Sequence, residues 1–89
     1  MGKEPFWFVL LSIDGPTARD QEVLRRTFFH FQEQHIEISW PHTFDFGGER
    51  HFLIVRCMPE DAERLKIEAT QFFQAEYESM KKAQEGGRS

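Results

Sequence analysis

The sequence predicts an α+β fold, a two-layer sandwich in which a three-stranded mixed sheet carries two helices on one face. Two short apolar runs, at 6–13 and 51–57, are rich in aromatic and β-branched residues, as strands are. A third segment, 35–46, begins with apolar and polar side chains in alternation, which is typical of a strand with one solvated face. Two longer segments, 17–34 and 60–82, repeat apolar residues at the helical period.

Length and composition predict one small domain. The chain has 89 residues, of which 39% are hydrophobic and 15% aromatic, including ten Phe. A chain of this size buries little more than ~60% of its unfolded surface, and each large ring contributes about 1.5–3 kcal/mol when it is buried. We expect a single domain over residues 1–85 and a flexible tail at 86–89.

The first strand is apolar on both of its faces. Strict alternation along FWFVLLSI separates two sets of side chains: Phe6, Phe8 and Leu10 on one face, and Trp7, Val9, Leu11 and Ile13 on the other. A turn at 14–16 follows the strand, and Thr17 is the expected N-cap of the first helix. This strand therefore raises the question of what covers its second face.

The first helix, over 17–34, presents one apolar stripe. At about 100° per residue, the stripe consists of Val23, Leu24, Thr27, Phe28 and Phe31. Phe29 lies about 140° around the helix from Leu24, outside that stripe. An aromatic residue away from the buried stripe is a candidate for a contact with another molecule.

The next two strands are expected to form a hairpin. The apolar face of the segment 35–46 consists of alternate residues, Ile36, Ile38 and Trp40. Pro41 has no backbone donor, which predicts an edge position or a bulge. A turn at 47–50 leads into the strand at 51–57, whose middle is apolar on both faces, as in the centre of a sheet.

The last helix, over 60–82, starts with Pro59 and two acidic residues, which suit a helix N-terminus. Its apolar face is broad and consists of Ala62, Leu65, Ala69, Phe72, Phe73 and Met80. Glu76 falls within that face, so we expect the helix to extend beyond the core near this residue.

The order of elements, strand–helix–strand–strand–helix, predicts how they pack. A right-handed parallel crossover joins the first two strands, and the hairpin then places the third strand in the middle of the sheet. This order resembles the ferredoxin-like fold without its fourth strand. Both helices are expected on one face, which leaves no part of the chain to cover the other face of the first strand.

An uncovered apolar face usually marks a binding surface. We therefore expect a small, non-catalytic protein-interaction module, acting as a homodimer or as a subunit or regulator of a larger assembly. The expected interface residues are Phe6, Phe8, Phe29 and Trp40. One alternative is that a helix end and the N-terminal residues fold over the strand. Another is a dimeric protein that binds a small molecule or metal in a pocket at the sheet face, including an enzyme.

Charge and cysteine content restrict the partner and the compartment. Eleven basic and fifteen acidic residues give a net charge of −4, which argues against a protein that tracks the phosphates of a nucleic acid. The single cysteine, Cys57, allows no intrachain disulfide. The N-terminal apolar run is too short for a membrane span and lacks a signal-peptide cleavage site. We expect a cytoplasmic protein whose partner is itself or another protein, without membrane contact.

Few side chains suggest chemistry, and no cofactor is expected. His42, Asp45, Glu49 and His51 could converge at the hairpin and hold a divalent metal, although solvated polar residues on a hairpin are the favoured interpretation. No catalytic signature surrounds Cys57, and Gly15 alone before the first helix does not make a phosphate-binding loop. The acidic residues are scattered along both helices, which is typical of solvated faces.

Two known families share parts of this pattern. Aromatic residues on an exposed sheet resemble those of RNA-recognition domains, but the fourth strand and the basic-Gly-aromatic motif of that family are missing. The element order is also similar to that of the small acidic modulators of DNA-damage recombinases of the DinI type. In that family the end of the last helix is densely acidic, whereas here the stretch 76–82 also contains Lys81 and Lys82. A third alternative is a modulator that mimics nucleic acid through its acidic helices.

Overall fold

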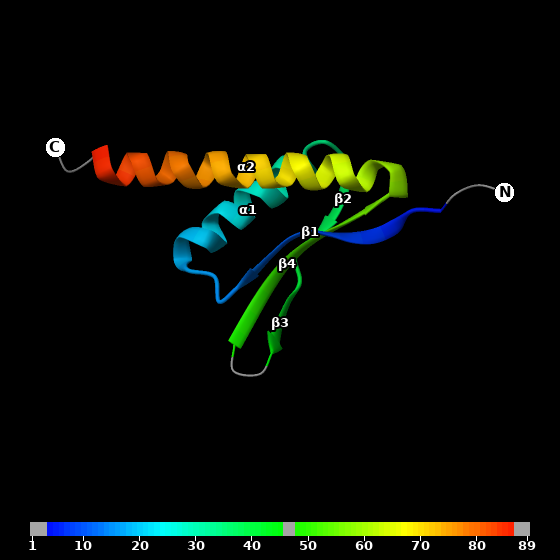
Figure 1. The fold of residues 1–89 in the computed structure, drawn as a ribbon, viewed down its shortest axis with the longest axis horizontal. Coiled ribbons are helices and arrows are strands. Elements are labelled where there is room, and N and C mark those ends of the chain that lie inside the picture. Colours follow the sequence, from blue (N-terminus) through cyan, green and yellow to red (C-terminus); the bar gives the residue numbers. More distant parts are fainter. Residues whose placement is uncertain (1–3, 46–47, 87–89) are drawn as a thin grey trace.

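The computed structural model describes residues 4–45 and 48–86, and within them it confirms the α+β class. Its elements are β1 (Phe6–Asp14), α1 (Ala18–Gln32), β2 (Glu37–Ser39), β3 (His42–Asp45), β4 (Gly48–Cys57) and α2 (Pro59–Gly86). Figure 1 shows α1 and α2 side by side, with the sheet below them. Gly86 is the last residue of α2, and the rest of the predicted tail, 87–89, lies outside the described residues.

The strand order is β1-β4-β2, with β3 also paired to β4. The third strand of the prediction, β4, is central as expected. Every described pairing is antiparallel, so the predicted mixed sheet is wrong in this detail. The reason is that β1 and β2 run in the same direction but are separated by β4, which is antiparallel to both.

The predicted strand at 35–46 is divided into β2 and β3. Both parts pair with β4 in the same register, and between them the Phe52 N–H donates to the Pro41 carbonyl at 3.0 Å. Together they form the edge of the sheet opposite β1, which confirms the edge position predicted from Pro41. β4 begins at Gly48, earlier than the predicted turn allows, because Gly48 already pairs with Asp45.

Both helices start as the sequence predicts. Thr17 caps α1 in a capping box: its Oγ1 accepts from the Asp20 N–H at 3.1 Å, and the Asp20 carboxylate accepts from the Thr17 N–H at 3.0 Å. Pro59 is the first residue of α2. Near Glu76, where we expect α2 to extend beyond the core, the Glu76 carboxylate forms an ion pair with Arg26 of α1, 3.1 Å long.

One core lies between the sheet and the two helices. Its buried residues come from both layers: Leu10, Leu24, Phe31, Leu53, Val55, Leu65 and Ala69. Leu53 and Val55 are 0% exposed, so the odd-numbered residues of β4 face the helices. Because successive side chains of a strand point to opposite faces, the even-numbered residues of β4 face away from them.

A bulge in β1 changes which side chains share a face. Val9 pairs with Ile54 and Leu11 pairs with Leu53, so Leu10 is an extra residue between them. Leu10 is buried, and Leu11 and Ile13 also pack against the core. The strict alternation expected for this strand is therefore wrong beyond Val9, because two consecutive side chains, Leu10 and Leu11, both contact the core.

Candidate interaction surface

The face of the sheet away from the helices carries an apolar strip. Register places Trp7 beside Arg56, Val9 beside Ile54 and Ser12 beside Phe52, all on this face. Trp7 is 51% exposed and Val9 is 44% exposed, while Phe52 and Ile54 are half-buried by their neighbours. We call Trp7, Val9, Phe52 and Ile54 the open-face strip. No described residue covers it from a second layer.

Ion pairs border the open-face strip at both ends. Arg50 donates two hydrogen bonds to the Asp14 carboxylate, 3.0 and 3.1 Å long. At the other end the Arg56 guanidinium lies 3.5 Å from the Glu37 carboxylate. Hydrogen bonding to Arg50, and then its positive charge, lower the pKa of Asp14. These four side chains carry no net charge together, so the rim of the strip is electrically balanced.

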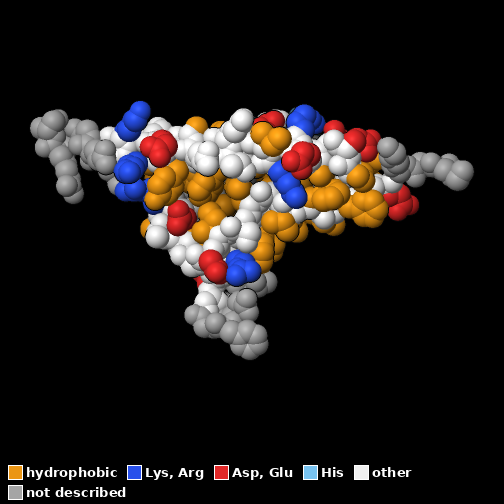
Figure 2. All heavy atoms as spheres, in the orientation of Figure 1, with side chains coloured by type: hydrophobic (Ala, Val, Ile, Leu, Met, Phe, Trp, Pro, Cys, Tyr) orange, Lys and Arg blue, Asp and Glu red, His pale blue; other side chains and the backbone are white. Residues whose placement is uncertain are grey.

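Exposed apolar side chains concentrate on β1. Phe6, 57% exposed, precedes Trp7 and Val9 on the same strand. Phe6 pairs with Cys57, two residues beyond the buried Val55, so it lies on the helix side of the sheet while Trp7 lies on the open side. Figure 2 shows hydrophobic side chains gathered where Figure 1 places the N-terminal half of β1, to the right of centre. This strand thus exposes apolar groups to both sides.

The residues predicted as the interface lie in three separate parts of the chain, namely β1, α1 and the link between β2 and β3. Phe6 is exposed and its ring makes an edge-on contact with Phe8, with ring centroids 6.4 Å apart. Phe8 and Trp40 are half-buried and pack against the core. Phe29 is 45% exposed on α1, where the Arg25 guanidinium lies 5.8 Å from its ring centroid. Among the four, Phe6 is the residue that adjoins the exposed part of β1.

Sequence reasoning missed Trp7 and Val9 as candidates. Ser12 is the polar residue in the apolar run, and it lies on the open face beside Phe52. Counting back from Ser12 by twos assigns Phe8 and Phe6 to the open face, which is the wrong set. The extra residue at Leu10 shifts the alternation by one. Two adjacent leucines in the sequence do not predict a bulge.

The hairpin histidines lie close together at the end of the sheet. His51 is 7% exposed, and the His42 ring stacks on it with centroids 5.2 Å apart. The Glu49 carboxylate lies 3.0 Å from His51 Nε2, but outside hydrogen-bond geometry. No three metal-ligating side chains among the described residues lie close enough together to hold an ion, and the side chain of Asp45 lies outside the described residues.

The same cluster contains buried polar atoms without a hydrogen-bond partner among the described residues. They are Trp40 Nε1 and both ring nitrogens of His51. The two rings meet edge-on, with centroids 5.8 Å apart.

Cys57 is not arranged as a nucleophile. Its side chain is half-buried and packs against the core. Burial, followed by the negative charge of Asp61, raises the pKa of the Cys57 thiol, and Arg64 offsets only part of that. A raised pKa keeps the thiol protonated at neutral pH, whereas a catalytic cysteine requires the thiolate.

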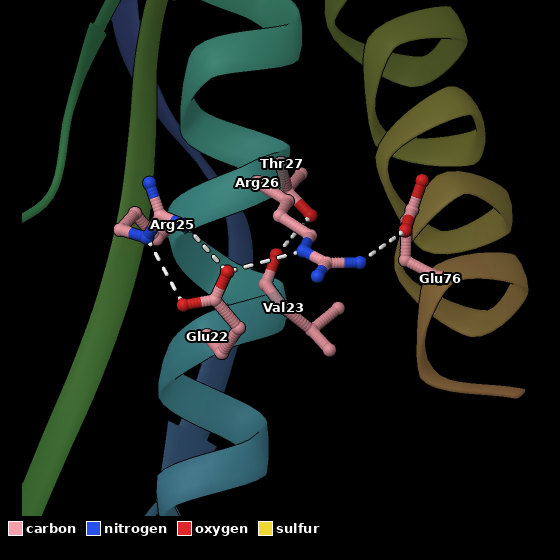
Figure 3. A network of polar contacts seen from close by, with 6 residues as sticks. All are labelled: Glu22, Val23, Arg25, Arg26, Thr27 and Glu76. Atoms are coloured by element: carbon pink, nitrogen blue, oxygen red, sulfur yellow. Dashed lines mark hydrogen bonds and ion pairs between the residues drawn. The ribbon is translucent and has the colours of Figure 1, made fainter. Parts of the chain in front are cut away.

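A network of polar contacts lies on the helix layer. Figure 3 shows Glu22 of α1 between Arg25 and Arg26, with Arg26 reaching across to Glu76 of α2. Hydrogen bonds from Arg25, then from Arg26, lower the pKa of Glu22. Thr27 is buried beside them and its hydroxyl donates to the Val23 carbonyl at 2.8 Å. Of these contacts, the Arg26–Glu76 ion pair joins α1 to α2 and the others lie within α1; none of them involves the open face of the sheet.

A hollow of about 410 Å³ lies on the helix layer. Its lining consists of Asp20, Phe73, Gln74, Tyr77 and Glu78. The rings of Phe73 and Tyr77 stack 6.2 Å apart, and the Arg19 guanidinium lies 5.5 Å from the Tyr77 ring centroid. This hollow is between α1 and α2, whereas the alternative function predicted from sequence requires a pocket at the sheet face.

No family model, curated protein or solved structure matches this chain.

None of the helices among the described residues is both long enough and apolar enough to cross a membrane.

Proposed function

We propose that this chain is a non-catalytic protein-interaction module that associates with a second copy of itself through β1. The observation that carries the proposal is the concentration of exposed apolar side chains on this strand. Phe6, Trp7 and Val9 are each more than two-fifths exposed within four residues. Exposed apolar groups that are contiguous, rather than scattered singly, are typical of interaction sites.

Charge favours a second copy as the partner. The chain carries −4, yet β1 has no charged residue between Phe6 and Ile13. The charges that border the open-face strip are paired within the chain, Arg50 with Asp14 and Arg56 with Glu37. A strongly basic or acidic partner would find no complementary charge here, whereas an identical uncharged strand brings no like charge into the contact itself.

The arrangement of reactive groups supports a binding function over a catalytic one. The raised pKa of Cys57 works against nucleophilic chemistry. The carboxylates with lowered pKa values, Asp14 and Glu22, are ion-paired to arginines at the surface. General acid–base catalysis instead needs a group with a pKa moved toward neutrality, and these shifts have the opposite direction.

A pair of matched variants tests the proposal. Trp7 and Ile67 are equally exposed, at 51% and 50%, but Ile67 lies on α2. We expect the wild type to show a concentration-dependent dimer by light scattering after gel filtration. Trp7→Lys should weaken that dimer by about tenfold or more, since it removes a large apolar contact from each copy. Ile67→Lys should leave the association unchanged.

Circular dichroism and thermal unfolding of both variants serve as the folding control. Because both side chains are half exposed, each variant should retain the wild-type spectrum. A wild type that stays monomeric at the highest accessible concentration would contradict the proposal. Equal effects of the two lysine variants would also count against it, because they would indicate a general effect of surface charge.

A further inference from the structure

The outer edge of β1 is free of any strand among the described residues. In the order β1-β4-β2 this strand is terminal, and its described pairing is with β4 alone. One side of its nine residues therefore presents backbone N–H and C=O groups that β4 does not use. Such a row is a template for another strand.

The two edges of the sheet differ in their protection. At the β2–β3 edge the strand is interrupted at Pro41, and Glu37 adds a charge. Short strands, proline and charge are the usual devices that prevent edge-to-edge association. The β1 edge has neither a proline nor a charge from Phe6 to Ile13. Within that stretch, the bulge at Leu10 is the one feature that would hinder edge-to-edge association. The pairing of Phe6–Val9 with β4 is regular.

The side chains on this edge point to both faces of the sheet. Phe6 lies on the helix side and Trp7 and Val9 lie on the open side. Stacking two copies through their open faces would cover Trp7 and Val9 but leave Phe6 in water. Pairing along the edge gives every one of these side chains a cross-strand neighbour, on whichever face it lies.

The geometry points to antiparallel pairing of β1 with β1 of a second copy, over Phe6–Val9, so that the two sheets become one continuous sheet. This inference rests on the proposed self-association and specifies its form. A two-fold axis between the two paired strands makes the contact isologous, with the same apolar residues contributed by each copy. Backbone hydrogen bonds supply affinity in this mode, and the alternating side chains supply specificity.

Two lysine variants separate edge pairing from face stacking. Phe6→Lys changes the edge on the helix side, away from the open face, at a side chain that is 57% exposed. Ile54→Lys changes the middle of the open face on the central strand, away from the edge. We expect Phe6→Lys to raise the dimer dissociation constant by roughly a hundredfold, because the lost contact occurs twice at a two-fold axis. Ile54→Lys should change it by less than about threefold.

Amide hydrogen exchange of the wild type, followed residue by residue by NMR, supplies a second readout. In the monomer, the alternate amides of 6–9 that point away from β4 should exchange rapidly. In a dimer paired along the edge, they should be slowed by at least about tenfold. Dilution below the dissociation constant should remove that protection.

The outcomes distinguish the two proposals. Dimerisation that Ile54→Lys abolishes and Phe6→Lys leaves intact overturns edge pairing while self-association stands. A monomeric wild type overturns both. If both variants weaken the dimer, or if Phe6→Lys does not fold, the exchange rates of the amides of 6–9 that point away from β4 decide the question. Slow exchange of these amides in the wild-type dimer supports edge pairing. Rapid exchange of these amides in the wild-type dimer overturns it.

Discussion

His35 occupies a backbone position that favours glycine. Its φ of 62° lies in the left-handed region. Around it, the Ile36 N–H donates to the Phe31 carbonyl at 3.4 Å and the His35 N–H donates to the Gln32 carbonyl at 3.0 Å. These two bonds form a Schellman motif, with His35 at the position after the helix where glycine is most common. The turn also explains why β2 begins at Glu37, two residues later than the sequence predicts.

We expect His35→Gly to increase the free energy of unfolding by about 0.5–1 kcal/mol, because glycine adopts a positive φ without a Cβ clash. Urea denaturation followed by circular dichroism measures the difference. His35→Ala is the control, since it removes the imidazole but keeps the Cβ, and it should give no increase. An equal gain from both substitutions would trace the effect to the side chain instead of the backbone.

Leu10 shows why residue-level patterns have a limit. Its bulge lets Leu10 and Leu11 both contact the core, and it thereby moves Trp7 and Val9 to the open face. Periodicity is a local signal, whereas a bulge depends on the strand that pairs alongside. The apolar character of both faces of β1 and the separation of Phe6 and Phe8 from Trp7 and Val9 were predictable from the sequence. Which of these two sets faces the helices was not, nor were the faces of the residues beyond Val9.

At the scale of elements, the aromatic residues of α1 lie at different angles around the helix axis, and their burial differs accordingly. Phe31 is 0% exposed in the core and Phe29 is 45% exposed at the surface. The 3.6-residue period of the helix predicts this difference, and the structure confirms that Phe31 belongs to the buried stripe. Whether Phe29 contacts a partner stays a prediction.

Phe31→Ala should lower the free energy of unfolding by about 3–5 kcal/mol, because it leaves a cavity at a fully buried site. Phe29→Ala, two residues along the same helix, should lower it by less than about 1 kcal/mol. Urea midpoints of the two variants, compared at one protein concentration, give the comparison. Similar losses from both would show that the Phe29 ring is also packed in solution.

Most of the element boundaries follow from local chemistry. Thr17 and Pro59 predict the starts of the helices because capping depends on neighbours in the chain. The divided β2–β3 edge was less predictable. Pro41 predicts an irregularity there, but only the common register with β4 shows that the two parts form one edge.

At the scale of the whole molecule, the chain combines a net charge of −4 with an uncharged strand as its proposed contact. Two approaching copies therefore repel each other at long range, while the contact itself contains no ion pair between copies. Added salt screens the repulsion. Added salt does not weaken the proposed dimer contact, because that contact is apolar and contains no ion pair between copies.

We therefore expect the dimer dissociation constant to stay constant or fall as the salt concentration rises from about 0.05 to about 0.5 M. Sedimentation equilibrium at several salt concentrations measures this. An interface built from the acidic helices and a basic surface would behave in the opposite way, and its affinity would drop with salt. Such a drop would argue against β1 as the contact.

The order of β1 and β4 along the chain has a consequence for synthesis on the ribosome. β1 leaves the ribosome before its partner β4, which ends at Cys57, the residue that pairs with Phe6. At about 5–20 residues per second, several seconds pass before β4 is complete. During that time neither edge of the strand has a partner within its own chain. Nascent chains on one messenger RNA carry the same uncharged segment close together, so β1 of one chain can meet β1 of the next before either domain has folded.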